Sequence, residues 1–196
     1  MNLPNRLTVL RIVLSFIFMF LLFSEGVLSK VIALCLFIIA CITDFYDGYI
    51  ARKYNLITDL GKLLDPIADK ILVLAAFLAF VEMGIIPAWM VVVIIFRELL
   101  ITGIRVLSAN KGKILAASLA GKHKTVSQMV SIFVILGFIV LKESGTTIFS
   151  FWNNSFEFWK EIIIGIFMYI TVALTLISGI SYMIKNKNVF WNAKSD

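Results

Sequence analysis

The sequence predicts an all-α membrane protein, a single domain over residues 1–196 with six transmembrane helices and a short N-terminal interfacial segment. Three observations support this fold class. Hydrophobic residues make up 61% of the chain and the mean hydropathy is +0.99, both far above the values of ordinary soluble domains. Apolar stretches recur at about the 20-residue length that crosses a bilayer. Lys and Arg residues are common in alternate connections between these stretches and scarce in the others.

The apolar stretches predict the six spans in order. They are expected at residues 8–24, 30–52, 62–83, 87–109, 124–142 and 158–184. Pro4 and Asn5 open the N-terminal segment, and residues 143–157 are expected to form an external loop. Pro66 fits best in the first turn of the third helix, where a missing N–H costs little.

The predicted spans also indicate where the two cysteines and the single histidine lie. Cys35 and Cys41 are six residues apart and lie on different faces of one helix, so no disulfide is expected between them. His123, the single histidine, stands between two lysines and is expected in a loop.

The distribution of positive charge predicts the orientation of the helices. If both termini face the cytoplasm, cytoplasmic segments carry thirteen Lys and Arg residues and external loops carry three. The thirteen are Arg6, Arg11, Arg52, Lys53, Lys62, Arg105, Lys111, Lys113, Lys122, Lys124, Lys185, Lys187 and Lys194; the three are Lys30, Lys142 and Lys160. Because this follows the positive-inside rule, the net charge of +6 indicates a multi-pass protein of the cytoplasmic membrane and no nucleic-acid partner.

Four of the six aspartates lie within 26 residues of this apolar chain, at Asp44, Asp47, Asp65 and Asp69. A charged side chain at the centre of a membrane helix costs about 2.5–3.5 kcal/mol on insertion scales, so these carboxylates need partners. Few cations accompany them locally, and hard divalent cations such as Mg²⁺ and Mn²⁺ prefer oxygen ligands. The cluster therefore predicts a divalent metal site at the cytoplasmic ends of the second and third helices.

The residues between the aspartates favour a phosphate-bearing ligand. Asp44 and Asp47 share a helix face, as do Asp65 and Asp69, because residues three or four apart are neighbours on a helix. The small residues Gly48, Ala51 and Gly61 leave room beside the carboxylates. Arg52 and Lys62 are candidates for holding the phosphates of the ligand. Two metals beside a phosphate suggest in-line displacement at phosphorus.

The segment from Asp44 to Asp69 resembles the signature of the CDP-alcohol phosphotransferase family. That signature reads D-x2-D-G-x2-A-R-x8-G-x3-D-x3-D, and every fixed position is present. The resemblance implies a six-helix membrane enzyme, usually a homodimer, with two divalent metals in a site that faces the cytoplasm. It also implies that the four aspartates are metal ligands, that Asp69 is the general base, and that Gly48, Arg52 and Gly61 line the CDP pocket.

Four further blocks are similar to the members of this family that use sn-glycerol 3-phosphate as acceptor and CDP-diacylglycerol as donor. They are Asn2–Ile12, Arg97–Arg105, Gly121–Gln128 and Gly179–Tyr182, so the likeness spans nearly the whole chain. A dianionic acceptor needs a cationic pocket beside the metal site. The candidates for this role are Arg97, Arg105, Lys122 and Lys124, with Glu98 either pairing with one of them or orienting the acceptor hydroxyls.

Several alternatives stay open at this point. The cations near residues 111–124 either bind the acceptor or set the topology and bind lipid headgroups. Asn5 and Thr8 either hydrogen-bond the CDP group or cap the first helix. Within the same chemistry, the acceptor is alternatively an inositol phosphate, serine or phosphatidylglycerol. A cation- or proton-coupled transporter would also place carboxylates within the membrane.

Overall fold

The computed structural model of the protein describes residues 3–54, 59–110 and 119–186, and within them the side chains of residues 9–43, 70–106, 108 and 121–186. Its regular elements are six α-helices. They are α1 (Leu3–Phe23), α2 (Val27–Tyr54), α3 (Asp59–Glu82), α4 (Ala88–Asn110), α5 (Leu119–Thr147) and α6 (Asn154–Lys185). No strand occurs in these ranges, which confirms the all-α class.

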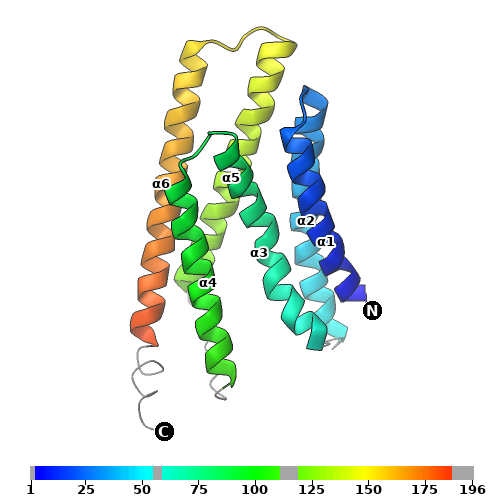
Figure 1. Ribbon diagram of the computed structural model, residues 1–196, viewed down its shortest axis with the longest axis vertical. Coiled ribbons are helices and arrows are strands. Elements are labelled where there is room, and N and C mark those ends of the chain that lie inside the picture. The colour runs from blue at the N-terminus through cyan, green and yellow to red at the C-terminus, as the bar shows by residue number, and fades with distance from the viewer. Residues whose placement is uncertain (1–2, 55–58, 111–118, 187–196) are drawn as a thin grey trace.

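Successive helices run in opposite directions along the bundle (Figure 1). The start of α1 and the end of α6 lie at one end, which we call the terminal end. The ends of α2 and α4 and the starts of α3 and α5 lie toward the terminal end too, and the other three connections lie toward the opposite end. The helix ends that were predicted to face the cytoplasm, within the described part of the chain, therefore lie at one end of the molecule.

Helix packing brings segments that are distant in sequence together. α1 packs on α2 and α3, α5 packs on α6 and α2, and α4 packs mainly on α6. Large side chains fill the interior, including Phe18 against Phe37 with ring centroids 5.6 Å apart. This arrangement surrounds the middle of α3 with α1, α4 and α5, so α3 connects the two halves of the bundle.

Apolar side chains cover the outside of the bundle, whereas polar ones lie inside it. Phe16, Phe20 and Phe96 are at least 66% exposed. By contrast, Ser131 and Thr171 are fully buried between α5 and α6, with their hydroxyl oxygens 2.8 Å apart. Small residues and buried hydroxyls at helix contacts are typical of membrane helices, because lipid drives no apolar association between them. The exposed apolar surface suits a lipid environment.

Two of the helices are long and apolar enough to cross a membrane, judged by length and composition over the part of the chain that is described. They are Gly121–Thr147 and Asn154–Lys185. Two shorter apolar helical stretches, Val9–Phe23 and Val27–Thr43, accompany them. These findings are consistent with a membrane protein.

The expected external loop at residues 143–157 is much shorter than predicted. α5 continues to Thr147, and α6 already begins at Asn154. The hydroxyl of Thr146 donates to the carbonyl of Lys142, and the Asn153 side chain caps α6 by accepting from Phe156 N at 3.1 Å. Local polar side chains thus extend both helices beyond their apolar stretches. For the same reason His123, expected in a loop, lies in α5 and is exposed.

Two other expectations about helix starts were wrong. α1 begins at Leu3, so Pro4 and Asn5 belong to the first helix and form no separate segment. α3 begins at Asp59, which places Pro66 in the helix interior instead of the first turn. Polar residues extended both helices past the apolar boundary that defined the predicted spans. The absence of a disulfide between Cys35 and Cys41 is confirmed.

Candidate active site

The four clustered aspartates lie on two helices that meet at the terminal end. Asp44 and Asp47 are in the second half of α2, and Asp65 and Asp69 are in the first half of α3. Only residues 55–58 separate the end of α2 from the start of α3. Because so short a segment spans at most about 18 Å, the two helix ends are held close together. Both pairs therefore have the helical spacing that the sequence predicted.

The side chains of these aspartates are outside the described part, and so are those of the predicted CDP-binding residues. The latter are Asn5 and Thr8 in α1, Gly48, Ala51 and Arg52 in α2, and Gly61 and Lys62 in α3. Among the side chains that are described, no group of three or more potential metal ligands occurs. A set of carboxylates on two adjoining helices is nevertheless the oxygen-rich donor set that Mg²⁺ and Mn²⁺ prefer.

A cavity of about 480 Å³ lies between α3, α4 and α5, and it is strongly cationic. Among the described residues of its lining, one carboxylate, Glu98, accompanies five cationic side chains: Lys70, Arg97, Arg105, Lys122 and Lys124. Leu72, Val73, Leu74 and Met129 form its apolar wall. The four cations proposed from the sequence to bind the acceptor thus line one cavity, although those of α4 and those of α5 are 17 to 27 positions apart in the sequence.

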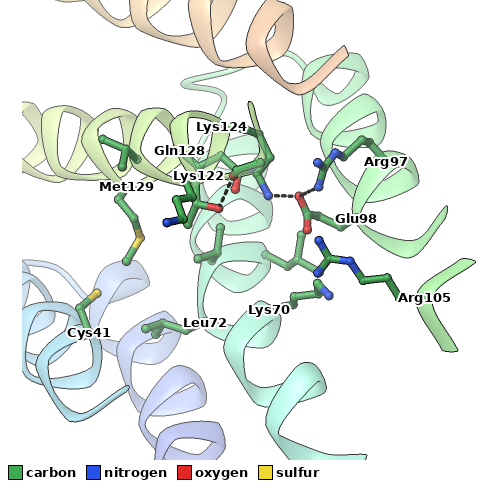
Figure 2. Close-up of a pocket in the computed structure, with 15 residues that line it drawn as sticks. Cys41, Lys70, Leu72, Arg97, Glu98, Arg105, Lys122, Lys124, Gln128 and Met129 are labelled. Atoms are coloured by element: carbon green, nitrogen blue, oxygen red, sulfur yellow. Dashed lines mark hydrogen bonds and ion pairs between the residues drawn. The ribbon is translucent and has the colours of Figure 1, made fainter. Parts of the chain in front are cut away.

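Glu98 organises the buried side of this cavity. Its Oε1 atom accepts from Lys124 Nζ and from Arg97 Nη1, the latter at 3.3 Å. Figure 2 shows the charged ends of Lys124, Arg97, Arg105 and Lys70 gathered around the Glu98 carboxylate. The side chains of Glu98 and Lys124 are only 11% and 6% exposed, so water screens the pair weakly. Glu98 therefore pairs with two of the cations, one of the roles that the sequence left open.

Lys70 joins the aspartate helix to the cavity. Its Nζ atom donates to Thr102 Oγ1, and that hydroxyl donates to the carbonyl of Glu98 at 2.7 Å. Lys70 directly follows Asp69, so their Cα atoms are about 3.8 Å apart. Lys70, the first residue of α3 whose side chain is described, thus connects the cavity to the helix segment that carries Asp65 and Asp69.

Sequence reasoning placed Lys70 within a helix and gave it no role, because its partners come from another helix. Gln128 belongs to the block Gly121–Gln128, which resembles a family segment, but no role was predicted for this residue from the sequence. It lines the cavity, is 3% exposed, and its Nε2 atom is a buried donor that makes no hydrogen bond within the described part. Arg105 and Lys122 are exposed, which leaves their charges accessible to a ligand that enters from the terminal end.

Comparison with known proteins covers nearly the whole chain. The CDP-alcohol phosphatidyltransferase family profile matches residues 1–184. A CDP-diacylglycerol–glycerol-3-phosphate 3-phosphatidyltransferase of Bacillus subtilis is 39% identical, covering 94% of this chain and 95% of the relative. One of the same name from Rickettsia bellii is 35% identical over 96% of this chain and 97% of its own.

A third relative has a different name. A probable phosphatidylglycerophosphate synthase of Mycobacterium tuberculosis is 36% identical, covering 93% of this chain and 80% of the relative. The profile match covers both the aspartate-bearing helices and the residues that line the cavity. The chain therefore belongs to the CDP-alcohol phosphatidyltransferase family.

Proposed function

We propose that this protein transfers the phosphatidyl group from CDP-diacylglycerol to sn-glycerol 3-phosphate, giving phosphatidylglycerophosphate and CMP. The observation that carries the proposal is the cavity in which Lys70, the residue after Asp69, lies with four further cationic side chains, Arg97, Arg105, Lys122 and Lys124. Relatives with the name of this enzyme match the chain from end to end. The protein is thus an enzyme of phospholipid biosynthesis.

The cavity is the binding site for the phosphate of the acceptor. Arginine guanidinium groups make paired hydrogen bonds to phosphate, and Arg97 and Arg105 supply two of them. Lys70, Lys122 and Lys124 add charge without fixed geometry. Glu98 offsets part of this charge and holds Lys124 and Arg97 in place before the acceptor arrives. A pre-ordered site reduces the entropy lost on binding.

Asp69 is the general base. With the acceptor phosphate held beside Lys70, a hydroxyl of the glycerol group reaches toward the aspartate end of α3. Asp69 accepts its proton while the hydroxyl oxygen forms a bond to the β-phosphorus of CDP-diacylglycerol. The bond from that phosphorus to the bridging oxygen breaks, and the bridging oxygen leaves with CMP. A carboxylate is a weak base, so the proton moves as the new bond forms.

Asp44, Asp47, Asp65 and Asp69 would hold two divalent ions, Mg²⁺ or Mn²⁺. When bound, such ions neutralise the pyrophosphate charge and lower the pKa of an adjacent hydroxyl. The family uses divalent metal in general, and the carboxylate-rich helix ends of this chain fit that requirement.

The CDP group is bound by α1, α2 and α3 around the aspartates. Gly48, Ala51 and Gly61 give the nucleotide access to the backbone, because they have little or no side chain. Arg52 and Lys62 bind its phosphates, and Asn5 and Thr8 close the site from the start of α1. This assignment follows from their positions on the three helix ends that share the terminal end of the bundle.

The membrane arrangement of the protein is part of the proposal. All six helices cross the cytoplasmic membrane, with both termini and the active site on the cytoplasmic side, and two copies form a homodimer. The exposed apolar side chains on every helix support contact with lipid. The exposed cations Arg105 and Lys122 support a cytoplasmic terminal end.

Two alternatives make different predictions about the same cavity. An inositol phosphate would suit the same cations, whereas serine or phosphatidylglycerol would leave the phosphate-binding cations without a free phosphate group. A cation- or proton-coupled transporter would use the aspartates, but it would have no need for five cations beside them.

The decisive experiment measures CMP release by the purified protein in lipid nanodiscs with CDP-diacylglycerol and Mg²⁺ or Mn²⁺. Glycerol 3-phosphate, inositol phosphate, serine and phosphatidylglycerol are offered separately. Release that requires glycerol 3-phosphate supports the proposal. Release only with another alcohol overturns the acceptor assignment, and ion flux without CMP release supports the transporter.

A further inference from the structure

Helix α6 contacts the cationic cavity indirectly, through the two arginines of α4. The block Gly179–Tyr182 was similar to a family segment but had no role in the reaction. Ser178, Gly179 and Tyr182 are not among the residues that line the cavity, and all three are buried. Each of them nevertheless touches an arginine that does line it. They lie on one side of α6, because Tyr182 is four positions after Ser178 and three positions after Gly179.

The first arginine, Arg97, is held by two consecutive residues of α6. Its Nη2 atom donates to Ser178 Oγ at 2.7 Å, a charge-assisted hydrogen bond of good geometry. Ser178 is 1% exposed, so water does not compete for this bond. At Gly179, a Cβ atom would lie 3.2 Å from Arg97 Cγ. Glycine at 179 therefore gives the aliphatic part of Arg97 room to pass α6.

The second arginine, Arg105, is held by Tyr182. The guanidinium carbon of Arg105 lies 5.5 Å from the centroid of the Tyr182 ring, within the range of cation–π attraction. Tyr182 is 2% exposed and packs in a small cluster with Ile101 and Ile104 of α4. The ring is thus fixed from the α4 side as well, and it presents one face to the guanidinium.

We propose that Ser178, Gly179 and Tyr182 are positioning residues that fix Arg97 and Arg105 to receive the phosphate of the acceptor. This inference rests on the proposed function of the cavity. A free arginine side chain samples many rotamers, and ordering it during binding weakens affinity. Because α6 already holds both arginines before the acceptor binds, less side-chain entropy is lost on binding. These contacts act on the acceptor only, since the donor binds at the aspartate end.

The experiment compares three variants with matched controls. Ser178→Ala removes the hydrogen bond, Gly179→Ala inserts a methyl group against Arg97, and Tyr182→Leu removes the ring. Ser178→Thr keeps the hydroxyl and Tyr182→Phe keeps the ring, so both conservative variants should recover most of the acceptor affinity. Ile180→Ala, at a 56% exposed position of the same helix, controls for general effects of substitution in α6.

We expect the KM for glycerol 3-phosphate to rise roughly tenfold in Ser178→Ala, as for loss of a hydrogen bond to a charged group. A rise of about threefold is expected in Tyr182→Leu. The KM for CDP-diacylglycerol should stay unchanged in both. Equal rises in both KM values, or a fall in kcat alone, would show that α6 is only structural and overturn the inference.

A binding measurement separates this inference from the proposed function. Thermal unfolding of each purified protein is followed with and without inorganic phosphate, which needs no turnover. The inference expects phosphate to stabilise the wild-type protein and Ile180→Ala more than Ser178→Ala or Tyr182→Leu. Equal stabilisation of all four proteins would contradict it. If the wild type released no CMP with glycerol 3-phosphate but showed this difference, the proposed function would fail and the positioning role would stand.

Discussion

The two ends of the bundle contain cavities of nearly equal size, but their described linings differ in charge. The cavity near the terminal end has a volume of about 480 Å³, and its described lining has five cations and one carboxylate. The cavity at the opposite end has about 470 Å³ and is lined by three lysines and three glutamates: Lys30, Lys142, Lys160, Glu143, Glu157 and Glu161. Volume therefore does not distinguish the two sites, and the excess of positive charge does.

The charged groups at the opposite end are used to join helix ends. Lys30 Nζ donates to the carbonyls of Leu22 and Ser24 at the end of α1, the latter at 2.8 Å. Glu157 accepts from Lys142, Lys160 and the Trp152 indole, so three donors share one carboxylate. Charges that satisfy each other in this way hold connections together. Near the terminal end the unbalanced cations remain suited to an anionic ligand.

The largest effect that would sharpen this comparison is expected from Asp69→Asn. Loss of the general base should lower kcat by about 10²- to 10⁴-fold, because an amide accepts no proton. CDP-diacylglycerol binding should persist. The measurement is CMP release together with nucleotide-lipid binding, and Glu161→Gln at the opposite end is the control with unchanged kcat. Substantial residual turnover would remove Asp69 from the role of base.

A second effect concerns stability, and it should differ between the two glutamates that accept from lysines. Glu98→Gln breaks a buried ion pair and should lower the free energy of unfolding by about 3 kcal/mol. Glu157→Gln should lower it by less than about 1 kcal/mol, because the Glu157 side chain is 33% exposed and Lys142 is 48% exposed. Thermal unfolding in detergent measures both. Equal losses would mean that burial does not separate the two networks.

A third effect is expected from Arg105→Ala. It should raise the KM for glycerol 3-phosphate about tenfold, as for loss of a hydrogen bond to a charged group, and leave the KM for CDP-diacylglycerol nearly unchanged. Lys142→Ala, which removes a cation from the opposite cavity, is the matched control. Steady-state kinetics with each substrate varied in turn provides the measurement. If Arg105→Ala raised both KM values alike, Arg105 would have a structural role.

The smallest effect is a difference in salt dependence. Raising the ionic strength from about 0.01 M to about 0.15 M shortens the screening length from ~30 Å to ~8 Å. The KM for glycerol 3-phosphate should then rise a few-fold in the wild-type protein, because exposed cations attract the acceptor. Lys122→Gln should reduce the rise of this KM with ionic strength, and Lys142→Gln should leave it unchanged. If the KM rose equally with ionic strength in all three proteins, Lys122 would contribute nothing to the attraction of glycerol 3-phosphate.

Some features of the fold followed from the sequence because they depend on nearby residues. The six helices and the spacing of the aspartates on α2 and α3 were predicted, since helical periodicity is a local property. The family was predicted too, from fixed residues in one 26-residue segment. The positions of the helix ends were predicted less accurately. Pro66, His123 and residues 143–157 were misplaced, because apolar runs do not reveal how far polar residues prolong a helix.

The sequence by itself thus determined the all-α class, the family and the cluster of aspartates. Only the tertiary structure decided how the cations of the cavity are partnered. Lys70 meets Thr102, 32 residues away, and Arg97 meets Ser178, 81 residues away. The physical reason is that such contacts depend on which helix faces pack together. Ser178 acquired its role when α4 packed against α6, and Glu98 acquired its role when Lys124 of α5 came within reach of its carboxylate. No local pattern in the sequence encodes that arrangement.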